Sequence, residues 1–350
     1  MRVADLRTPA LVLDSSVLEH NLTAMARVRP GPALRPHVKA TKTTSLARRQ
    51  HQLGHTGFTC ATVAEMEGLA AAGLSDDLLL ANEVLDPERL SAAAGLDARV
   101  TVAVDSDATV DAAVAAGISE VLIDVNVGLP RCGCPPDDAG RLAERARAAG
   151  LRVRGVMGYE GLATIAPHRA DRAPIVESAM ADLKAAHADV GGDIVSAGST
   201  VTYEMNTTAT EIQAGSYAFM DTAFAEFEDL PFRIAMSLWS TVISTNADGY
   251  GVCDSGLKSL GMDHGNPVLD PSGVAVDVPT ATGHDVLVVS DEHITFAHPS
   301  GSPLDVGDRV RVLPAHVDPT VAYHRRLWLA DGAGPDANVI DDWAIDLLGW

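Results

Sequence analysis

The chain has 350 residues, 47% of them hydrophobic, and a formal net charge of −21 at pH 7. A summed negative field of this size repels nucleic acid and anionic lipid, so these partners are excluded and a small-molecule ligand is expected. Because no run of about 18 apolar residues occurs, a membrane-spanning helix is excluded as well. The N-terminus reaches Asp5 before any apolar stretch, which argues against a secretory signal and predicts a cytoplasmic location.

Short β-rich apolar runs alternate with alanine-rich helical stretches, a pattern typical of parallel β–α units. Eight strands are predicted, at residues 33–37, 57–61, 77–82, 99–105, 119–126, 152–158, 193–197 and 211–218. Helical patterns lie between them, among others at 44–53, 64–72, 137–149 and 169–188. Eight such units in about 200 residues predict an α/β fold of the TIM (β/α)8 barrel type, in which catalytic groups collect at the carboxyl ends of the strands.

The pattern changes after about residue 230, where glycine, proline and aspartate become frequent. Strand-like pieces at 238–245, 285–290 and 308–313 follow one another without long helices, which predicts a mainly antiparallel β-domain. We place the boundary at Pro231, with a barrel domain over 8–230 and a C-terminal β-domain over 231–350 that includes 1–7. Because no low-complexity linker separates them, the two domains are expected to pack together.

Lysine is rare, with four residues against 22 arginines, and two of the four are Lys39 and Lys42. Lys39 follows the first predicted strand by two residues, at the face where such barrels carry their chemistry. Unlike arginine, lysine can lose its proton when desolvated, and its free amine attacks carbonyl groups to form a Schiff base. Lys39 is therefore a candidate nucleophile. The alternative is a solvated lysine pair near a helix start, with lysine rare through codon bias.

Two segments rich in small and hydroxyl residues follow the last two predicted barrel strands, where barrel enzymes commonly bind phosphate. They are Ser196–Thr200 and Ala214–Tyr217. Small residues let backbone N–H groups approach phosphate oxygens, and hydroxyl groups add donors. With a Schiff-base lysine, the two segments indicate a pyridoxal phosphate site, while each alone is also ordinary turn material.

Two further candidates follow predicted strands. Arg131 would fix a phenolate or carboxylate by charge-assisted bonds, and a surface loop arginine is the alternative. His316 and Asp318 are two residues apart, so in an extended chain their side chains point the same way and both could reach one cation. Two protein ligands leave open positions, as in a catalytic metal site, and one nitrogen with one oxygen donor suits Mn²⁺ or Mg²⁺. The alternative is a chance His-x-Asp pair.

Several stretches of the chain together carry a family resemblance that runs nearly end to end. They are Thr8–Asp14, Leu34–Lys39, Asn82–Val84, Arg131–Gly133, Gln213–Asp221, Asp254–Ser259, Asp291–His293 and His316–Thr320. In this order they resemble the fold-type III pyridoxal enzymes related to alanine racemase, and within them the D-threonine aldolase and D-serine dehydratase group. The resemblance implies a head-to-tail homodimer.

The resemblance also implies roles for individual residues. Lys39 would be the Schiff-base lysine, and His316 with Asp318 would bind a divalent cation, Mn²⁺ or Mg²⁺ in preference to Zn²⁺. The residues implied to contact pyridoxal 5'-phosphate are Arg131, Tyr159, Ser199, Thr200, Gly215, Ser216 and Tyr217. Aldolase-like members usually carry a histidine at or just after the Tyr-x-Gly of strand six, whereas this chain has Glu160 there. The base is therefore expected to be hydroxide on the cation, with Glu160 as the second candidate.

The dehydratase branch typically has His-x-Cys at the metal, so the carboxylate of Asp318 favours the aldolase branch. The expected activity is cleavage of a D-β-hydroxy-α-amino acid to glycine and an aldehyde by a carbon–carbon lyase that depends on pyridoxal phosphate and a divalent metal. The alternative is a D-serine or D-threonine dehydratase that releases a 2-oxo acid and ammonia. A non-enzymatic pyridoxal phosphate carrier is more remote, because a carrier has no use for an open metal site.

Overall fold

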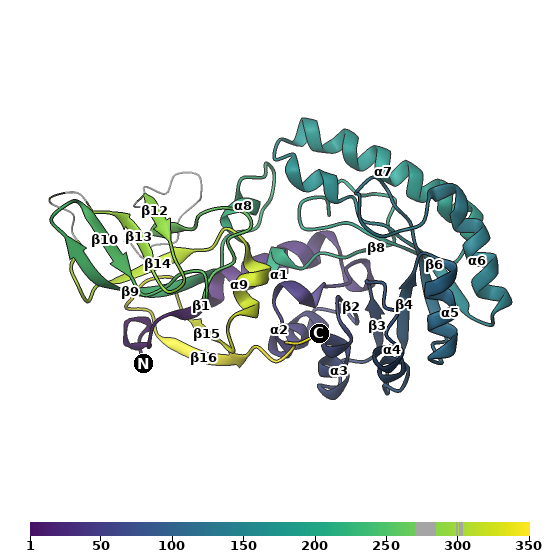
Figure 1. The fold of residues 1–350 in the computed structure, drawn as a ribbon, viewed down its shortest axis with the longest axis horizontal. Helices are drawn as coiled ribbons and strands as arrows, with labels where there is room; N and C mark the ends of the chain where they lie inside the picture. The colour runs from purple at the N-terminus through teal and green to yellow at the C-terminus, as the bar shows by residue number, and fades with distance from the viewer. Residues whose placement is uncertain (271–284, 299, 301–303) are drawn as a thin grey trace.

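The computed structural model describes residues 1–270, 285–298, 300 and 304–350, which form two lobes (Figure 1). One lobe is a curled parallel sheet with helices on its outside, and the other is a mainly antiparallel sheet. The predictions of a parallel β–α domain and an antiparallel β-domain are therefore confirmed. None of the helices in these described ranges is long and apolar enough to cross a membrane.

The barrel domain, our name for the parallel sheet and its helices, has seven strands in chain order. They are β2 (Gly57–Cys60), β3 (Asp77–Leu80), β4 (Val100–Val104), β5 (Glu120–Asp124), β6 (Arg152–Met157), β7 (Ile194–Ala197) and β8 (Glu211–Ile212). The helices are α1 (Ser15–Val28), α2 (Thr44–Gln52), α3 (Val63–Ala71), α4 (Pro87–Ala94), α5 (Asp107–Ala115), α6 (Ala139–Ala148), α7 (Arg169–Val190) and α8 (Thr222–Ala225). Strand β8 is shorter than the predicted 211–218, because the chain turns into the short 3₁₀ helix η6 (Ser216–Ala218).

The predicted first strand, residues 33–37, is not a regular strand but occupies its expected place. Leu34 makes a parallel bridge to β8, and His37 makes one to β2. Pro36 has no N–H to donate to a ladder, so the pairing stays short. This segment, the closing segment, joins the two edges of the seven-stranded sheet and leads directly to Lys39.

The β-domain contains β1 (Ala10–Asp14), β9 (Met236–Asn246), β10 (Tyr250–Cys253), β11 (Val268–Asp270), β12 (Val286–Val289), β13 (Ile294–Ala297), β14 (Arg309–Leu313), α9 (Val317–Ala322), β15 (Arg326–Ala330) and β16 (Val339–Ala344). Strand β1 lies between β9 and β15, antiparallel to the first and parallel to the second. It comes from the segment 8–230 that the sequence assigned to the barrel domain. The boundary at Pro231 itself stays a prediction.

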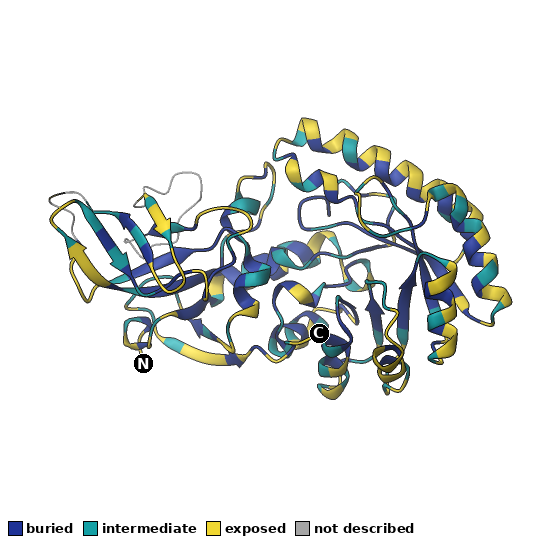
Figure 2. Ribbon diagram, in the orientation of Figure 1, coloured by how far each residue is buried: buried dark blue, intermediate teal, exposed yellow. Residues whose placement is uncertain are grey.

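Burial follows these layers (Figure 2), with the strands of the parallel sheet almost wholly buried and the outer faces of the helices exposed. The parallel strands are covered on both faces, which is why they appear in sequence as short apolar runs rather than alternating patterns. Side-chain caps start several of the helices that follow them, among them α3 and α4. Thr62 and Glu65 form a capping box at α3, and Asp86 caps α4 with Pro87 in its first turn.

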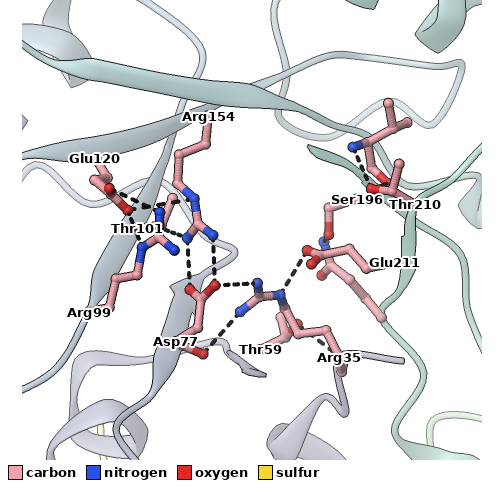
Figure 3. Close-up of polar contacts among 12 residues, drawn as sticks. Arg35, Thr59, Asp77, Arg99, Thr101, Glu120, Arg154, Ser196, Thr210 and Glu211 are labelled. Atoms are coloured by element: carbon pink, nitrogen blue, oxygen red, sulfur yellow. Dashed lines mark hydrogen bonds and ion pairs between the residues drawn. The ribbon is translucent and has the colours of Figure 1, made fainter. Parts of the chain in front are cut away.

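A network of buried ion pairs fills the foot of the barrel, at the amino ends of the strands (Figure 3). Arg35 of the closing segment donates from Nε to Glu211 Oε1 (2.7 Å) and from Nη2 to Asp77 Oδ2 (3.0 Å). Arg154 donates to both oxygens of Asp77, at 2.7 and 2.6 Å. Burial acts to raise the pKa of Asp77, but the hydrogen bonds and charges of the two arginines outweigh it and lower that pKa to about 2.

We expect Arg35→Met to lower the free energy of unfolding by roughly 3–5 kcal/mol, because it leaves the buried Glu211 carboxylate without its partner. Chemical denaturation measures the loss. The matched control is Arg141→Met, which breaks an exposed pair with Asp107 and Asp138 and should cost about 1 kcal/mol or less. Equal losses in the two variants would contradict the proposed role of the network.

Candidate active site

A cavity of about 1210 Å³ opens between the two domains, at the carboxyl ends of the barrel strands. Most residues that the sequence nominated lie on its wall. They are Lys39, Arg131, Tyr159, Ser199, Thr200, Gly215, Ser216, His316 and Asp318. Two nominated residues, Glu160 and Tyr217, are absent from the wall.

The two lysines of this segment lie in different environments. Lys39 lies in the 3₁₀ helix η3 (Val38–Ala40), its side chain is 49% exposed, and its Nζ is 3.5 Å from Asp318 Oδ2. The Nζ of Lys42 contacts Glu65 Oε1 at 2.7 Å, and Glu65 is fully buried. The amine of Lys42 is therefore committed to a structural ion pair, whereas that of Lys39 faces the cavity.

Several ionisable side chains surround Lys39 on the cavity wall. His37, two residues before it, is partly buried on the cavity wall, and this burial together with the nearby charges of Lys39 and Lys42 holds the pKa of the imidazole well below its usual range. The ring is therefore neutral at neutral pH. Lys39, Lys42 and Arg131 all line the cavity, so an anionic ligand can meet basic side chains there despite the negative charge of the whole chain.

Two loops after β7 and β8 present small and hydroxyl residues to the cavity. Gly198 has a φ of +89°, in the left-handed region that favours glycine. A Cβ on Gly215 would lie 2.4 Å from the carbonyl oxygen of His37, so only glycine lets this loop pack directly on the lysine segment. The Thr200 hydroxyl accepts the N–H of Tyr217 at 3.0 Å, which leaves its own proton free to donate to an anion.

Tyr217 lies under this loop rather than on the wall of the cavity. Its side chain is fully buried, and Gln50 donates to its hydroxyl at 2.9 Å. Burial raises its pKa well above the usual value, so the ring stays neutral. Its direct contribution to the loops is the backbone N–H donated to Thr200.

Glu160 also lies beneath the loops. It is 2% exposed, and each carboxylate oxygen accepts one hydrogen bond, from the Gly198 N–H and from Asn206 Nδ2, both at 3.0 Å. Both oxygens are thus engaged in holding the 198–206 loop. The neighbouring Tyr159 does reach the cavity, where Arg131 stacks over its ring at 5.1 Å from the centroid. Burial raises the pKa of Tyr159.

His316 and Asp318 lie at the start of helix α9 and not in the extended chain that the sequence argument assumed. His316 is the N-cap residue and Asp318 is in the first turn. Their donor atoms still converge, with Nε2 of His316 4.0 Å from Oδ1 of Asp318. The buried Asp221 fixes this turn by accepting the N–H of Val317 at 2.9 Å, and burial raises the pKa of Asp221 to about 6.

Sequence reasoning missed two residues beside this pair, Asp263 and His264. Asp263 Oδ2 is 2.7 Å from His316 Nδ1, and the His264 ring stacks on the His316 ring with centroids 3.8 Å apart. Ligand atoms of Asp263, His264 and His316 all lie within 4.8 Å of one another. An adjacent aspartate and histidine some 50 residues upstream was the available signal, but only the fold shows that they meet His316.

Residues 13–223 match the family described as alanine racemase, N-terminal domain, and residues 235–330 match the putative serine dehydratase domain. The parallel barrel domain with its lysine-bearing cavity therefore places the protein in the alanine racemase-like class. Pyridoxal phosphate is the cofactor that this class implies.

Comparison with individual proteins identifies the family within this class. The chain is 33% identical to the D-threonine aldolase of an Arthrobacter species over 374 residues, covering 99% of this chain and 94% of that protein. The crystal structure of D-threonine aldolase from Filomicrobium marinum superposes with a TM-score of 0.86 at 33% identity, covering 98% of this chain and 96% of the other. A D-threo-3-hydroxyaspartate dehydratase variant in its metal-free form gives a TM-score of 0.84 at 25% identity over the whole of both chains. The protein belongs to the family that contains these aldolases and dehydratases.

We expect Lys42→Ala to lower the free energy of unfolding by roughly 3 kcal/mol or more, because the fully buried Glu65 would lose its only cationic partner in the described structure. The control is Lys258→Ala, since Lys258 forms an exposed pair with Glu292 and its removal should cost about 1 kcal/mol or less. Denaturant titration of both variants checks the difference. A Lys42 variant as stable as the control would show that Glu65 does not depend on this lysine.

Proposed function

We propose that this protein is a pyridoxal phosphate- and divalent-cation-dependent lyase that cleaves D-β-hydroxy-α-amino acids to glycine and an aldehyde. The observation that carries the proposal is the 3.5 Å approach of Lys39 Nζ to Asp318 Oδ2. The lysine comes from the barrel domain and the carboxylate from the β-domain. An amino acid whose amine lies at Lys39 therefore has its β-hydroxyl, three bonds away, within reach of a cation held at Asp318.

The cavity wall fits pyridoxal phosphate. The amine of Lys39 would hold the cofactor, and its phosphate would meet the loops after β7 and β8 at Ser199, Thr200, Gly215 and Ser216. The hydroxyl groups there are donors, and the glycine lets the backbone approach closely. Arg131, stacked on Tyr159, would pair with an anionic group of the cofactor or the substrate.

The pair at the start of α9 fits a divalent cation. His316 Nε2 and Asp318 Oδ1, which lie 4.0 Å apart on the cavity wall, are the atoms that would hold the cation. With two protein ligands the remaining positions stay open to substrate. A donor set of one nitrogen and one oxygen favours Mn²⁺ or Mg²⁺, whereas softer ligand sets select zinc.

When bound, the cofactor supplies an electron sink for the electrons released by Cα–Cβ cleavage, and the cation supplies a Lewis acid at the β-hydroxyl. The residues of the chain hold and orient the reactants. Lys39 would hold the cofactor and receive the amine end of the substrate beside it, while His316 and Asp318 would hold the cation that orients the hydroxyl. Glu160 acts as a positioning residue for the loop that it supports, and we assign it no proton transfer, because both its oxygens already accept hydrogen bonds.

The choice between aldolase and dehydratase rests on Asp318. A carboxylate at this position keeps the site hard, as Mn²⁺ or Mg²⁺ requires, and a cysteine there would favour zinc. A dehydratase would use the same lysine and cation to expel the hydroxyl group, so the products decide between the two reactions.

We expect D-threonine with Mn²⁺ to give glycine and acetaldehyde, and exhaustive chelation to remove most of the activity. Asp318→Ala should lower the rate on the order of tenfold or more, because the Lewis acid supplies several kcal/mol to the developing alkoxide. Chromatography of the products with an ammonia assay checks the reaction. Release of ammonia and a 2-oxo acid without glycine would replace the aldolase by a dehydratase, and full activity after chelation would refute the metal-dependent mechanism.

We also expect hydride reduction to fix the cofactor irreversibly on Lys39, as read by peptide mapping. Lys39→Ala should lose both the attachment and the activity, since no other amine on the cavity wall is free of a buried partner in the described structure. Lys184→Ala is the control, because it removes a lysine of α7 away from the cavity. An adduct on Lys42 or Lys258 would show the assignment to be mistaken.

A further inference from the structure

The His316 side chain is supported from the side of its Nδ1 atom. Asp263, in the loop between β10 and β11, places Oδ2 2.7 Å from that nitrogen. The loop is itself tied to the start of α9, because Gly261 forms a β-bridge with His316 and donates its N–H to Thr320 Oγ1 at 3.0 Å. A Cβ on Gly261 would lie 2.2 Å from the Pro319 ring, so glycine is needed for this approach.

The contact decides which nitrogen of His316 is available to a cation. A neutral imidazole has one N–H, and a carboxylate at hydrogen-bond distance draws that hydrogen to the nitrogen it faces. Here the hydrogen is drawn to Nδ1, so the lone pair is left on Nε2. Nε2 is the atom that lies 4.0 Å from Asp318 Oδ1, on the cavity wall.

The flat face of the His316 ring is covered as well. The His264 ring lies parallel to it, with centroids 3.8 Å apart and an interplanar angle of 7°. Rotation of the His316 ring about its Cβ–Cγ bond would have to displace this neighbour. The edge of the His316 ring is therefore held by Asp263 and its face by His264, which are consecutive residues of one loop.

We propose that Asp263 is the positioning residue for the cation-binding imidazole of His316, with His264 as the packing surface that keeps the ring in plane. The proposal rests on the cation site of the proposed function and adds a residue that the His-x-Asp pattern does not contain. Hydrogen-bonded carboxylates behind metal-binding histidines set the tautomer and the ring orientation, and their loss typically weakens metal affinity about 10- to 100-fold. Because the Asp263 side chain is 57% exposed, we expect the lower end of that range.

The test is Mn²⁺ binding by the metal-stripped full-length protein, measured by calorimetry and by electron paramagnetic resonance. We expect Asp263→Ala to raise the Kd for Mn²⁺ about tenfold. Asp263→Asn keeps an oxygen that can accept the Nδ1 hydrogen, so it should retain more affinity than the alanine variant. Asp248→Asn, in the turn between β9 and β10, removes the same charge away from the cavity and should bind as the unmodified protein does.

A second readout separates positioning from a general structural effect. Long-range ¹H–¹⁵N spectra of histidine-labelled protein should show His316 with its hydrogen on Nδ1, and in Asp263→Ala part of that hydrogen population should move to Nε2. Unchanged Mn²⁺ affinity or an unchanged His316 tautomer in Asp263→Ala would overturn the proposal. So would a loss in both Asp263 variants as large as that of Asp318→Ala, because Asp263 would then be a ligand itself. If the unmodified protein fails to bind Mn²⁺, it is the cation site of the proposed function that fails.

Discussion

The position of Lys39, the lysine of the proposed reaction, depends on an ion pair at the opposite end of the barrel. Arg35 is buried between Glu211 of the edge strand β8 and Asp77 of β3, and it ties the closing segment to both strands. That segment has few ladder hydrogen bonds of its own, since Pro36 interrupts them. Its placement therefore relies on charge-assisted bonds in a region shielded from solvent. Lys39 follows four residues later, so the ion pairs at the amino ends of the barrel strands help to position a residue at the carboxyl ends.

The cavity is assembled from two domains, and neither holds a complete set of reactive groups. The barrel domain contributes the lysine and the small, hydroxyl-bearing loops, while the β-domain contributes the imidazole and carboxylate of α9. Hydrogen bonds cross the junction between the domains, such as those from the Val317 N–H to Asp221 and from the Ser216 hydroxyl to Asp318. Relative motion of the domains would separate the groups that must meet the amine and the β-hydroxyl of one substrate. Rigid packing at this junction is thus part of the chemistry.

The sequence predicted the elements whose signal is local and missed those that depend on distant partners. Buried parallel strands and their helices were located within a few residues, because each carries its own hydrophobic pattern. Strand β1 is not among the eight predicted strands, and only its partners β9 and β15 place its segment in the other sheet. For the site, Lys39 could be ranked by its place after a strand. The engagement of Glu160 with Gly198 and the approach of Asp263 to His316 involve residues 38 and 53 positions apart, which no spacing rule reaches.

The pairing of β1 has a consequence for the order of folding. Leu11 pairs with Leu327 and with Leu238, so the first strand of the chain must wait for two of the later ones before its hydrogen bonds form. The parallel sheet, in contrast, joins strands in the order of synthesis. On the ribosome, the barrel domain can mature while β1 and its apolar residues remain unpaired, an exposed edge of the kind that chaperones shield. Helix α9, which begins at the His316 and Asp318 segment, follows β14 and is therefore synthesised only after the whole barrel domain.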